Sequence, residues 1–208
     1  MNMKRFFLML VMTITSFQLY AQQAEVLVLP PVDKSVNTSV FDALQNRKSE
    51  RAFSDRYIDK SVLSQLLWAA CGVNRPDGKI TAPSAMNAQD VLVYVCLSDA
   101  AWRYDAGRHA LVKVCDGDLR GAVAGRQDFV KTAPVCLVLV SDVSKLGGSE
   151  LMGAMDAGIV AENVALACSA LKLATVPRVS MDNDALRKAL KLEEQQVPMM
   201  NLPVGYPQ

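Results

Sequence analysis

The feature that most constrains the fold is an apolar stretch at residues 150–172, which is long enough for a six-turn helix and contains few polar residues. Ser149 stands at the expected N-cap, directly after Gly147 and Gly148. Apolar side chains occupy nearly every face, so this helix should be buried and not merely amphipathic. In a chain of 208 residues, such a helix predicts a subunit interface as well as a core.

Residues 1–21 have the pattern of a secretory signal peptide. Lys4 and Arg5 precede an apolar run at residues 6–14, which is too short to span a membrane, and Ala21 provides a cleavage site. Cleavage there leaves 187 of the 208 residues, enough for one domain with a sizeable core. We therefore expect an exported, periplasmic protein that is not membrane-bound after cleavage. It should consist of an extended arm at residues 22–35 and a single domain at residues 36–208.

Charge and cysteine content narrow the classes of partner and site. Removal of residues 1–21, which carry two bases and no acid, changes the net charge from +1 to −1 and argues against nucleic acid or an anionic membrane as partner. Five cysteines leave at least one thiol unpaired within an exported monomer. Cys96, Cys136 and Cys168 lie in apolar runs and are interpreted as core residues.

His109 is the only histidine of the chain. A single histidine excludes a metal site built from several histidines. It also leaves little support for nucleophilic catalysis by a histidine-activated residue. Any catalysis must therefore be carried out by a group that the chain binds.

Helical and strand-like segments are mixed without a repeating strand–helix–strand order, which predicts an α+β fold. Caps and apolar stripes predict further helices at residues 40–46, 60–71, 116–124 and 182–192. Apolar and β-branched runs predict strands at residues 91–97, 134–141 and 174–180 and a hairpin from 102–105 and 110–114. Residues 197–204 are strand-like but contain Pro198 and Pro203, so we expect an edge strand or an exchanged arm there.

Residues 47–53 predict a face that carries two guanidinium groups and a hydroxyl. Arg47, Ser49, Arg51 and Phe53 alternate, so in an extended segment they project to one side. An arginine suits phosphate and flat ring carbonyls, because it offers paired donors that stay charged. A solvated charged loop is the alternative interpretation of this stretch taken alone.

Residues 47–53, taken with residues 83–89, resemble the FMN-dependent nitroreductase family. The resemblance extends over residues 36–207. Residues 102–105 and 117–120 are similar to the smaller, peptide-azoline-oxidase-like branch of the family. Further similar segments are residues 156–158 with 162–163, and residues 202–207. The resemblance implies an α+β, nitroreductase-like fold with a central, mostly antiparallel sheet packed with helices. It also implies an intertwined homodimer with two FMN sites at the subunit interface.

Carried over by position, the resemblance assigns Arg47 to the FMN phosphate, and Ser49 and Arg51 to the polar edge of the ring or the ribityl chain. The other subunit would cover the ring with Pro83, Ser84 and Asn87. A third group would lie along the flavin and offer backbone N–H groups near its reactive nitrogen: Pro177, Arg178, Val179 and Ser180. Gln127 is a loose match to a residue at the pyrimidine edge. No side chain is assigned a catalytic role, because FMN carries the chemistry.

The resemblance implies ping-pong electron transfer from a donor such as NADH or NADPH, through FMN, to a small-molecule acceptor such as a nitro compound or a quinone. A fixed guanidinium beside the flavin would stabilise the negative charge of its reduced form, and Arg47, Arg51 and Arg178 are the candidates. Because pyridine nucleotides are scarce outside the cytoplasm, a different electron donor stays open.

Two departures from the family pattern favour a non-catalytic flavin-binding or carrier protein as the alternative. Val179 or Ser180 stands where relatives place a glycine beside the flavin, and no basic tail follows the closing strand. A dimeric fold with an empty site is a third possibility.

Overall fold

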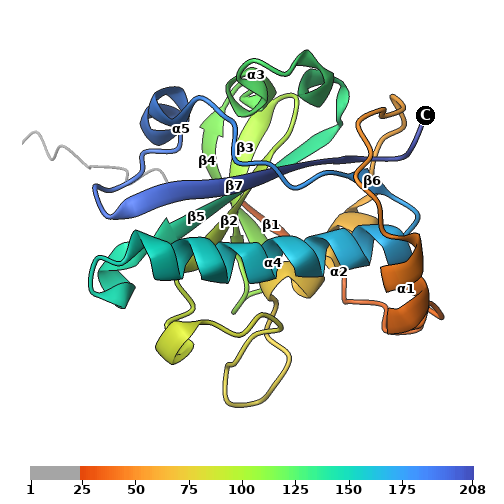
Figure 1. The fold of residues 1–208 in the computed structure, drawn as a ribbon, viewed down its shortest axis with the longest axis horizontal. Coiled ribbons are helices and arrows are strands. Elements are labelled where there is room, and N and C mark those ends of the chain that lie inside the picture. Colours follow the sequence, from red (N-terminus) through yellow and green to blue (C-terminus); the bar gives the residue numbers. More distant parts are fainter. Residues whose placement is uncertain (1–23) are drawn as a thin grey trace, which may run out of the picture.

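The computed structural model describes residues 24–208, so the expected signal peptide lies outside the described residues. Its centre is a seven-stranded antiparallel sheet with the order β1-β4-β3-β2-β5-β7-β6. Helices α2 and α4 cover one face of this sheet, and α3 and α5 cover the other (Figure 1). The expected α+β fold with a mostly antiparallel sheet is confirmed.

The strands are β1 (Val26–Val28), β2 (Val91–Cys96), β3 (Ala100–Asp105), β4 (Ala110–Asp116), β5 (Val135–Asp142), β6 (Ala174–Thr175) and β7 (Gln196–Gly205). The α-helices are α1 (Val40–Asn46), α2 (Lys60–Cys71), α3 (Arg120–Ala124), α4 (Glu150–Ala170) and α5 (Asn183–Ala189). Three short 3-10 helices complete the set: η1 (Ala85–Asn87), η2 (Asp128–Thr132) and η3 (Val143–Leu146).

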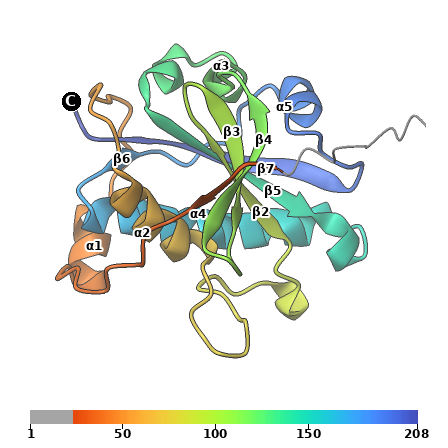
Figure 2. The same cartoon turned by 180° about the vertical axis from the view of Figure 1, so that it is seen from behind.

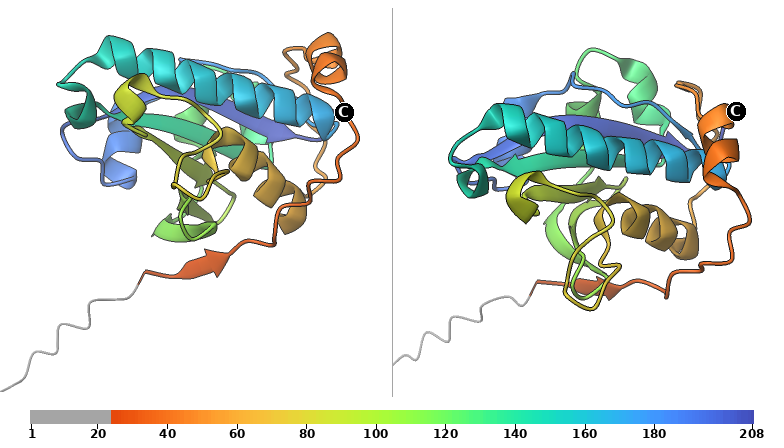
Figure 3. Two further views of the ribbon diagram at one scale, coloured as in Figure 1. Left: turned by 90° about the horizontal axis from the view of Figure 1, so that it is seen from below. Right: turned by 60° about the horizontal axis from the view of Figure 1, so that its bottom comes forward.

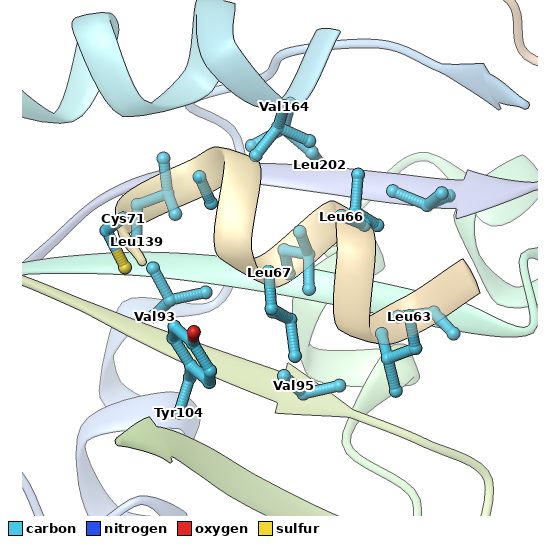
Figure 4. Close-up of a cluster of buried hydrophobic side chains, with 14 of the residues drawn as sticks. Leu63, Leu66, Leu67, Cys71, Val93, Val95, Tyr104, Leu139, Val164 and Leu202 are labelled. Carbon is cyan, nitrogen blue, oxygen red and sulfur yellow. The ribbon is translucent and has the colours of Figure 1, made fainter. Parts of the chain in front are cut away.

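Two hydrophobic cores lie on the two faces of the sheet, because strand side chains alternate. Val93 and Val95 of β2 face the core formed with α2 and α4, where Leu67 points toward them (Figure 4). The intervening residues, Tyr94 and Cys96, face the core formed with α3 and α5. The central strands β2 and β5 are thus largely buried on both faces, which explains their nearly unbroken apolar sequence.

The cysteines expected in the core, Cys96, Cys136 and Cys168, are fully buried, which confirms that interpretation. Burial raises the pKa of Cys136 to about 12, and Cys71 is affected in the same way. These thiols therefore stay protonated at neutral pH and are poor nucleophiles.

Helix α4 begins as predicted, with the Ser149 side chain accepting a hydrogen bond from Met152 N at 3.3 Å. It lies close to β5 at Gly153, where an added Cβ would be 2.8 Å from Cβ of Ser141. One face is buried against the sheet, but Leu151 and Met155 on the outer face are 73% and 64% exposed. A single chain therefore buries only part of the apolar surface of this helix.

The expectation that residues 197–204 form an edge strand is wrong only at their C-terminal end. There β7 lies between β5 and β6, whereas residues 196–200 pair with β5 alone among the described strands. The two prolines are tolerated for local reasons. Strand β6 pairs with β7 only at Val204 and Gly205, and the β5–β7 register shifts next to Pro198. Backbone N–H groups are therefore not required at every position of the strand.

Two other element boundaries differ from expectation. The strand expected at residues 174–180 is only two residues long and is followed by an isolated bridge between Arg178 and Asn201. The helix expected from residue 116 begins at Arg120, because β4 continues to Asp116. Viewed from behind, the expected extended arm supplies β1, which lies beside β4 at the opposite edge of the sheet from β6 (Figure 2).

Candidate functional site

Residues 47–53 leave the end of α1 as an extended segment that runs past β6 toward the C-terminus (Figure 1). Glu50 N donates to Thr175 O at 2.9 Å, and Ser54 N donates to Tyr206 O at 2.9 Å. Between these two contacts, Phe53 forms a bridge with Pro207. These contacts hold the extended backbone of residues 47–53 against the sheet, as expected for a segment in which residue types alternate.

The alternation divides the segment into two chemically different sides. Lys48 and Glu50 form an ion pair with an N–O distance of 2.5 Å. The side chains of Arg47, Ser49 and Arg51 form no hydrogen bond or ion pair within residues 24–208. The segment therefore presents two guanidinium groups and a hydroxyl whose donors are free to bind a ligand.

Phe53 anchors this segment in the protein. Its side chain is buried, and its ring stacks on Phe129 with a centroid distance of 6.5 Å and an interplanar angle of 19°. The Arg178 guanidinium lies over the Phe129 ring, 5.6 Å from its centroid. The two aromatic rings thus connect residues 47–53 to the segment around Arg178.

Arg178 is a buried guanidinium whose donors are used within the protein. Its Nε donates to Gln127 Oε1 at 2.9 Å, and Nη1 donates to Asn201 Oδ1 at 2.6 Å. The guanidinium also donates to Val123 O at 3.2 Å and to Ala124 O at 3.1 Å. It therefore fixes the end of α3 against β7. Of the three arginine candidates for the flavin charge, this one is held by protein acceptors.

Burial lowers the pKa of the Arg178 guanidinium from its ordinary value, and the charge of Arg51 acts in the same direction. The two cationic groups are therefore within electrostatic reach of each other. Both remain charged at physiological pH, because an arginine guanidinium does not deprotonate there. Together they form a region of positive potential at this corner of the molecule.

Two backbone N–H groups of the 177–180 segment are also unpaired among the described residues. Val179 N and Ser180 N donate to no acceptor among the described residues, whereas Arg178 N donates to Asn201 O at 2.8 Å. The Val179 side chain is 72% exposed. Gln127 is exposed and uses its carbonyl oxygen for Arg178, which leaves its amide N–H groups as donors. The structure thus brings Gln127 and residues 177–180 together with the 47–53 segment.

Pro83, Ser84 and Asn87 lie elsewhere, on the loop around η1 near the N-terminal half of α4. Residues 47–53 lie near its C-terminal end, where Ser169 Oγ donates to Ala43 O at 2.8 Å. Figures 1 and 3 show the two segments at opposite ends of this helix. Within one chain the two halves of the predicted site do not meet. That the η1 loop serves a second subunit stays a prediction.

A family model described as the nitroreductase family matches residues 44–206. The chain belongs to the nitroreductase family. Its fold and its sequence agree with a solved structure from Ralstonia eutropha JMP134 that is named as a nitroreductase, with 34% identity and a TM-score of 0.83 over 89% of this chain and 91% of the other.

Two archaeal relatives support the same assignment. A protein from Methanocaldococcus jannaschii named as a nitroreductase is 29% identical over 79% of this chain and 89% of its own length. A protein from Methanothermobacter thermautotrophicus named as an NADH dehydrogenase/NAD(P)H nitroreductase is 26% identical, with coverages of 81% and 77%. Members of this nitroreductase family are generally oxidoreductases.

Sequence reasoning missed Asn201 and Phe129, which position the corner. Asn201 is fully buried and binds Arg178 through both its backbone and its side chain. The only signal available was a polar residue within an apolar strand, because a buried polar group needs partners. Phe129 follows a turn and carries no comparable signal.

The contrast between Arg178 and Arg51 can be tested by replacing each with methionine. Arg178→Met should lower the free energy of unfolding by about 3 kcal/mol, because it leaves buried carbonyl groups unpaired. Arg51→Met should change it by at most about 0.5 kcal/mol, because that side chain is exposed and makes no hydrogen bond or ion pair to the described residues. Urea unfolding of both variants checks this. Equal losses would contradict the division between a supporting and a ligand-facing arginine.

Proposed function

We propose that this chain is an FMN-dependent oxidoreductase of the nitroreductase type, in the smaller, peptide-azoline-oxidase-like branch. The observation that carries the proposal is the free donor set at the corner described above: Arg47, Ser49, Arg51, and the N–H groups of Val179 and Ser180. FMN presents a phosphate and a flat ring edged with carbonyl and nitrogen acceptors. The chemistry of these donors fits both parts.

In this proposal Arg47 binds the phosphate, whereas Ser49 and Arg51 face the polar edge of the ring or the ribityl chain. The N–H groups of Val179 and Ser180, which follow Pro177 and Arg178, lie along the ring, with the Gln127 amide at its pyrimidine edge. When bound, FMN would supply the redox chemistry: a donor such as NADH or NADPH would reduce it by hydride transfer, and a small-molecule acceptor would reoxidise it in a ping-pong order. The name of the Methanothermobacter relative supports a pyridine nucleotide as donor.

The chain's own contribution is electrostatic and positional. Arg51 supplies a positive charge that stabilises negative charge on the ring edge, and the buried charge of Arg178 adds to the same potential. Because the Arg178 side chain is fixed by four acceptors, this potential is already oriented before the ligand arrives. The acceptor, a nitro compound, a quinone or a similar molecule, is not identified by these residues.

A flavin-binding protein without turnover is the second candidate, and Val179 favours it. Val179 or Ser180 stands where the family resemblance implies a glycine beside the flavin, and the Val179 side chain is exposed. Reduction of the bound flavin by NADH, NADPH or a chemical reductant, followed by reoxidation with an acceptor, separates the two candidates. Turnover supports the enzyme, and a flavin that is bound but never reduced supports the carrier.

We propose that the functional unit is a homodimer formed through the outer face of α4. Leu151, Met155 and Ile159 recur at intervals of four residues on this face and are all exposed in a single chain. Helix α4 is long and apolar enough to cross a membrane by length and composition, yet its inner face packs on the sheet. A second subunit would cover the outer face and would bring its own Pro83, Ser84 and Asn87 over the flavin.

The dimer proposal predicts that Met155→Arg weakens self-association by about 2 kcal/mol or more, because it places an unpaired charge in an apolar interface. The variant should stay folded, since Met155 is exposed in the single chain. Gln195→Arg, an exposed residue between α5 and β7, is the matched control. Light scattering coupled to gel filtration measures the mass. A Met155→Arg protein that keeps the mass of a dimer at low micromolar concentration contradicts this interface.

We also propose that residues 1–21 direct export to the periplasm and are then removed. The basic start and short apolar run of this segment support the proposal. Mass spectrometry of the native protein should find an N-terminus at or near Gln22. Intact Met1 in the cytosolic fraction would contradict export.

The phosphate assignment predicts different responses to two flavins. Arg47→Ala should weaken FMN binding by about 1.5–3 kcal/mol, roughly ten- to a hundredfold, because a charge-assisted contact to phosphate is lost. Riboflavin lacks the phosphate, so its affinity should be the same in both proteins. Arg51→Gln should weaken both flavins together and lower the reduction potential of the bound flavin.

Lys48→Ala is the matched control for the two arginine variants, because Lys48 belongs to the same segment but pairs with Glu50. Its affinity for both flavins should equal that of the unaltered protein. Fluorescence titration of each variant with FMN and with riboflavin measures the affinities. Equal losses for the two flavins in Arg47→Ala would refute the phosphate assignment.

A further inference from the structure

Two carboxyl groups lie buried together beneath the η1 loop, far from residues 47–53. Asp90, directly before β2, is 0% exposed, and Asp156 of α4 is 4% exposed. Asp90 Oδ2 accepts a hydrogen bond from Ser141 Oγ at 2.5 Å. Asp90 Oδ1 is buried and has no donor among the described residues. Such an orphaned oxygen is costly in a protein interior, so it requires an explanation.

A proton between the two carboxyl groups accounts for the orphaned oxygen. Both carboxyl groups lie around Ser141, whose Oγ donates to Asp90 and whose side chain packs against Gly153, one helical turn before Asp156. The neighbouring Asp156 also contributes to the raised pKa of Asp90. Both oxygens of Asp156 already accept from Ala85 N, at 3.1 and 2.9 Å. The Asp156 oxygens therefore already serve as acceptors for the loop. Asp90 is the better proton carrier, because a proton on its Oδ1 gives that atom a role as donor.

The conformation of the η1 loop explains why it needs this support. Met86, Asn87 and Gln89 have φ values of 53°, 55° and 46°, which are unfavourable for residues other than glycine. Four hydrogen bonds from side chains or to residues outside the loop hold it. They are Ala85 N to Asp156, Gln89 N to Ser84 Oγ at 2.8 Å, Gln89 Nε2 to Gly78 O at 3.3 Å, and Lys145 Nζ to Gln89 O at 3.1 Å. Among these hydrogen bonds, the one to Asp156 is the one whose acceptor residue is buried.

We propose that Asp90 and Asp156 are positioning residues that share one proton and thereby hold the η1 loop in the shape that covers the flavin of the other subunit. The covering role of the loop rests on the proposed function. The hold on the loop rests on this chain's own contacts. Loss of the shared proton places two negative charges side by side in the interior, and it loosens the loop.

The neighbouring charges do not provide an alternative partner for Asp90. Lys145 of η3 is exposed and directs its ammonium group to the Gln89 carbonyl. Asp142, at the end of β5, directs its carboxylate to Ser144 Oγ at 2.5 Å. Glu150, in the first turn of α4, is exposed. Asp156 is therefore the ionisable group that acts on Asp90 from the elements packed around it.

The direction of the pH dependence follows from the burial of Asp90. Burial raises its pKa above the ordinary value of 3.8, and the hydrogen bond and charge of Asp156 raise it further, against the opposing effect of Ser141. The folded protein thus binds this proton more tightly than the unfolded chain does. The stability that it contributes is complete below pH 3.8 and is lost as the pH rises through the raised value.

Amide hydrogen exchange of the peptide containing residues 82–89 tests the proposal, with protection factors measured from pH 4 to pH 8. Asp90→Asn retains a donor toward Asp156 and an acceptor for Ser141 but cannot ionise. Its loop should therefore stay protected at high pH, where that of the unaltered protein loosens. Asp156→Asn loses the charged acceptor, and its loop protection should fall by about tenfold at all pH values. Asp142→Asn, a nearby carboxylate outside the pair, is the matched control and should follow the unaltered protein.

Melting temperatures of the same proteins provide a second readout that does not depend on any ligand. Asp90→Asn should melt above the unaltered protein by a margin that grows with pH. An Asp90→Asn protein whose melting temperature lies below that of the unaltered protein by the same margin at every pH would overturn the shared proton. Unchanged loop protection in a folded Asp156→Asn would overturn the hold on the loop.

FMN affinity separates this inference from the proposed function. If Asp156→Asn loosens the loop and weakens FMN binding, the hold on the loop and the covering role of the loop both stand. If it loosens the loop and leaves FMN affinity unchanged, the hold on the loop stands and the covering role assigned to Pro83, Ser84 and Asn87 is wrong.

Discussion

The candidate site depends on the buried guanidinium of Arg178. A charge removed from water is stable only when its donors are satisfied, and here acceptors from α3, Gln127 and β7 satisfy them. This requirement fixes where the chain turns after β6, and so it fixes the exposed N–H groups of residues 179–180. Because Arg178 is occupied by the protein, Arg47 and Arg51 remain as the free cationic donors of the corner.

Local patterns were sufficient to predict much of the fold. The apolar composition of α4, the caps at Ser149 and Asp182 and the alternation in residues 47–53 depend on neighbours in the sequence, and the structure agrees with them. The position of β7 could not be predicted this way, since strand order is decided by pairing between distant segments. The acceptors of Arg178 are mostly main-chain oxygens and a strand asparagine, and the Asp90–Asp156 contact joins residues far apart in the chain. None of these has a local signature.

Helix α4 connects the two halves of the proposed flavin site. Its C-terminal end packs beside α1 and residues 47–53, and its N-terminal half carries Asp156, which holds the loop predicted to reach the other subunit. Its inner face forms the core, whereas its outer face exposes an apolar stripe. One helix therefore serves folding, the proposed assembly and the proposed positioning of a cofactor, which accounts for its unusually apolar sequence.

The central claim is that the free donors at the corner of residues 47–51 and 179–180 bind FMN. The most direct measurement is the absorption spectrum of the purified native protein, combined with identification of any cofactor released on denaturation. The account predicts the two visible bands of a bound flavin and one FMN per chain. A colourless protein that also binds no FMN when titrated with it would contradict the account and would favour a nitroreductase fold with an empty site.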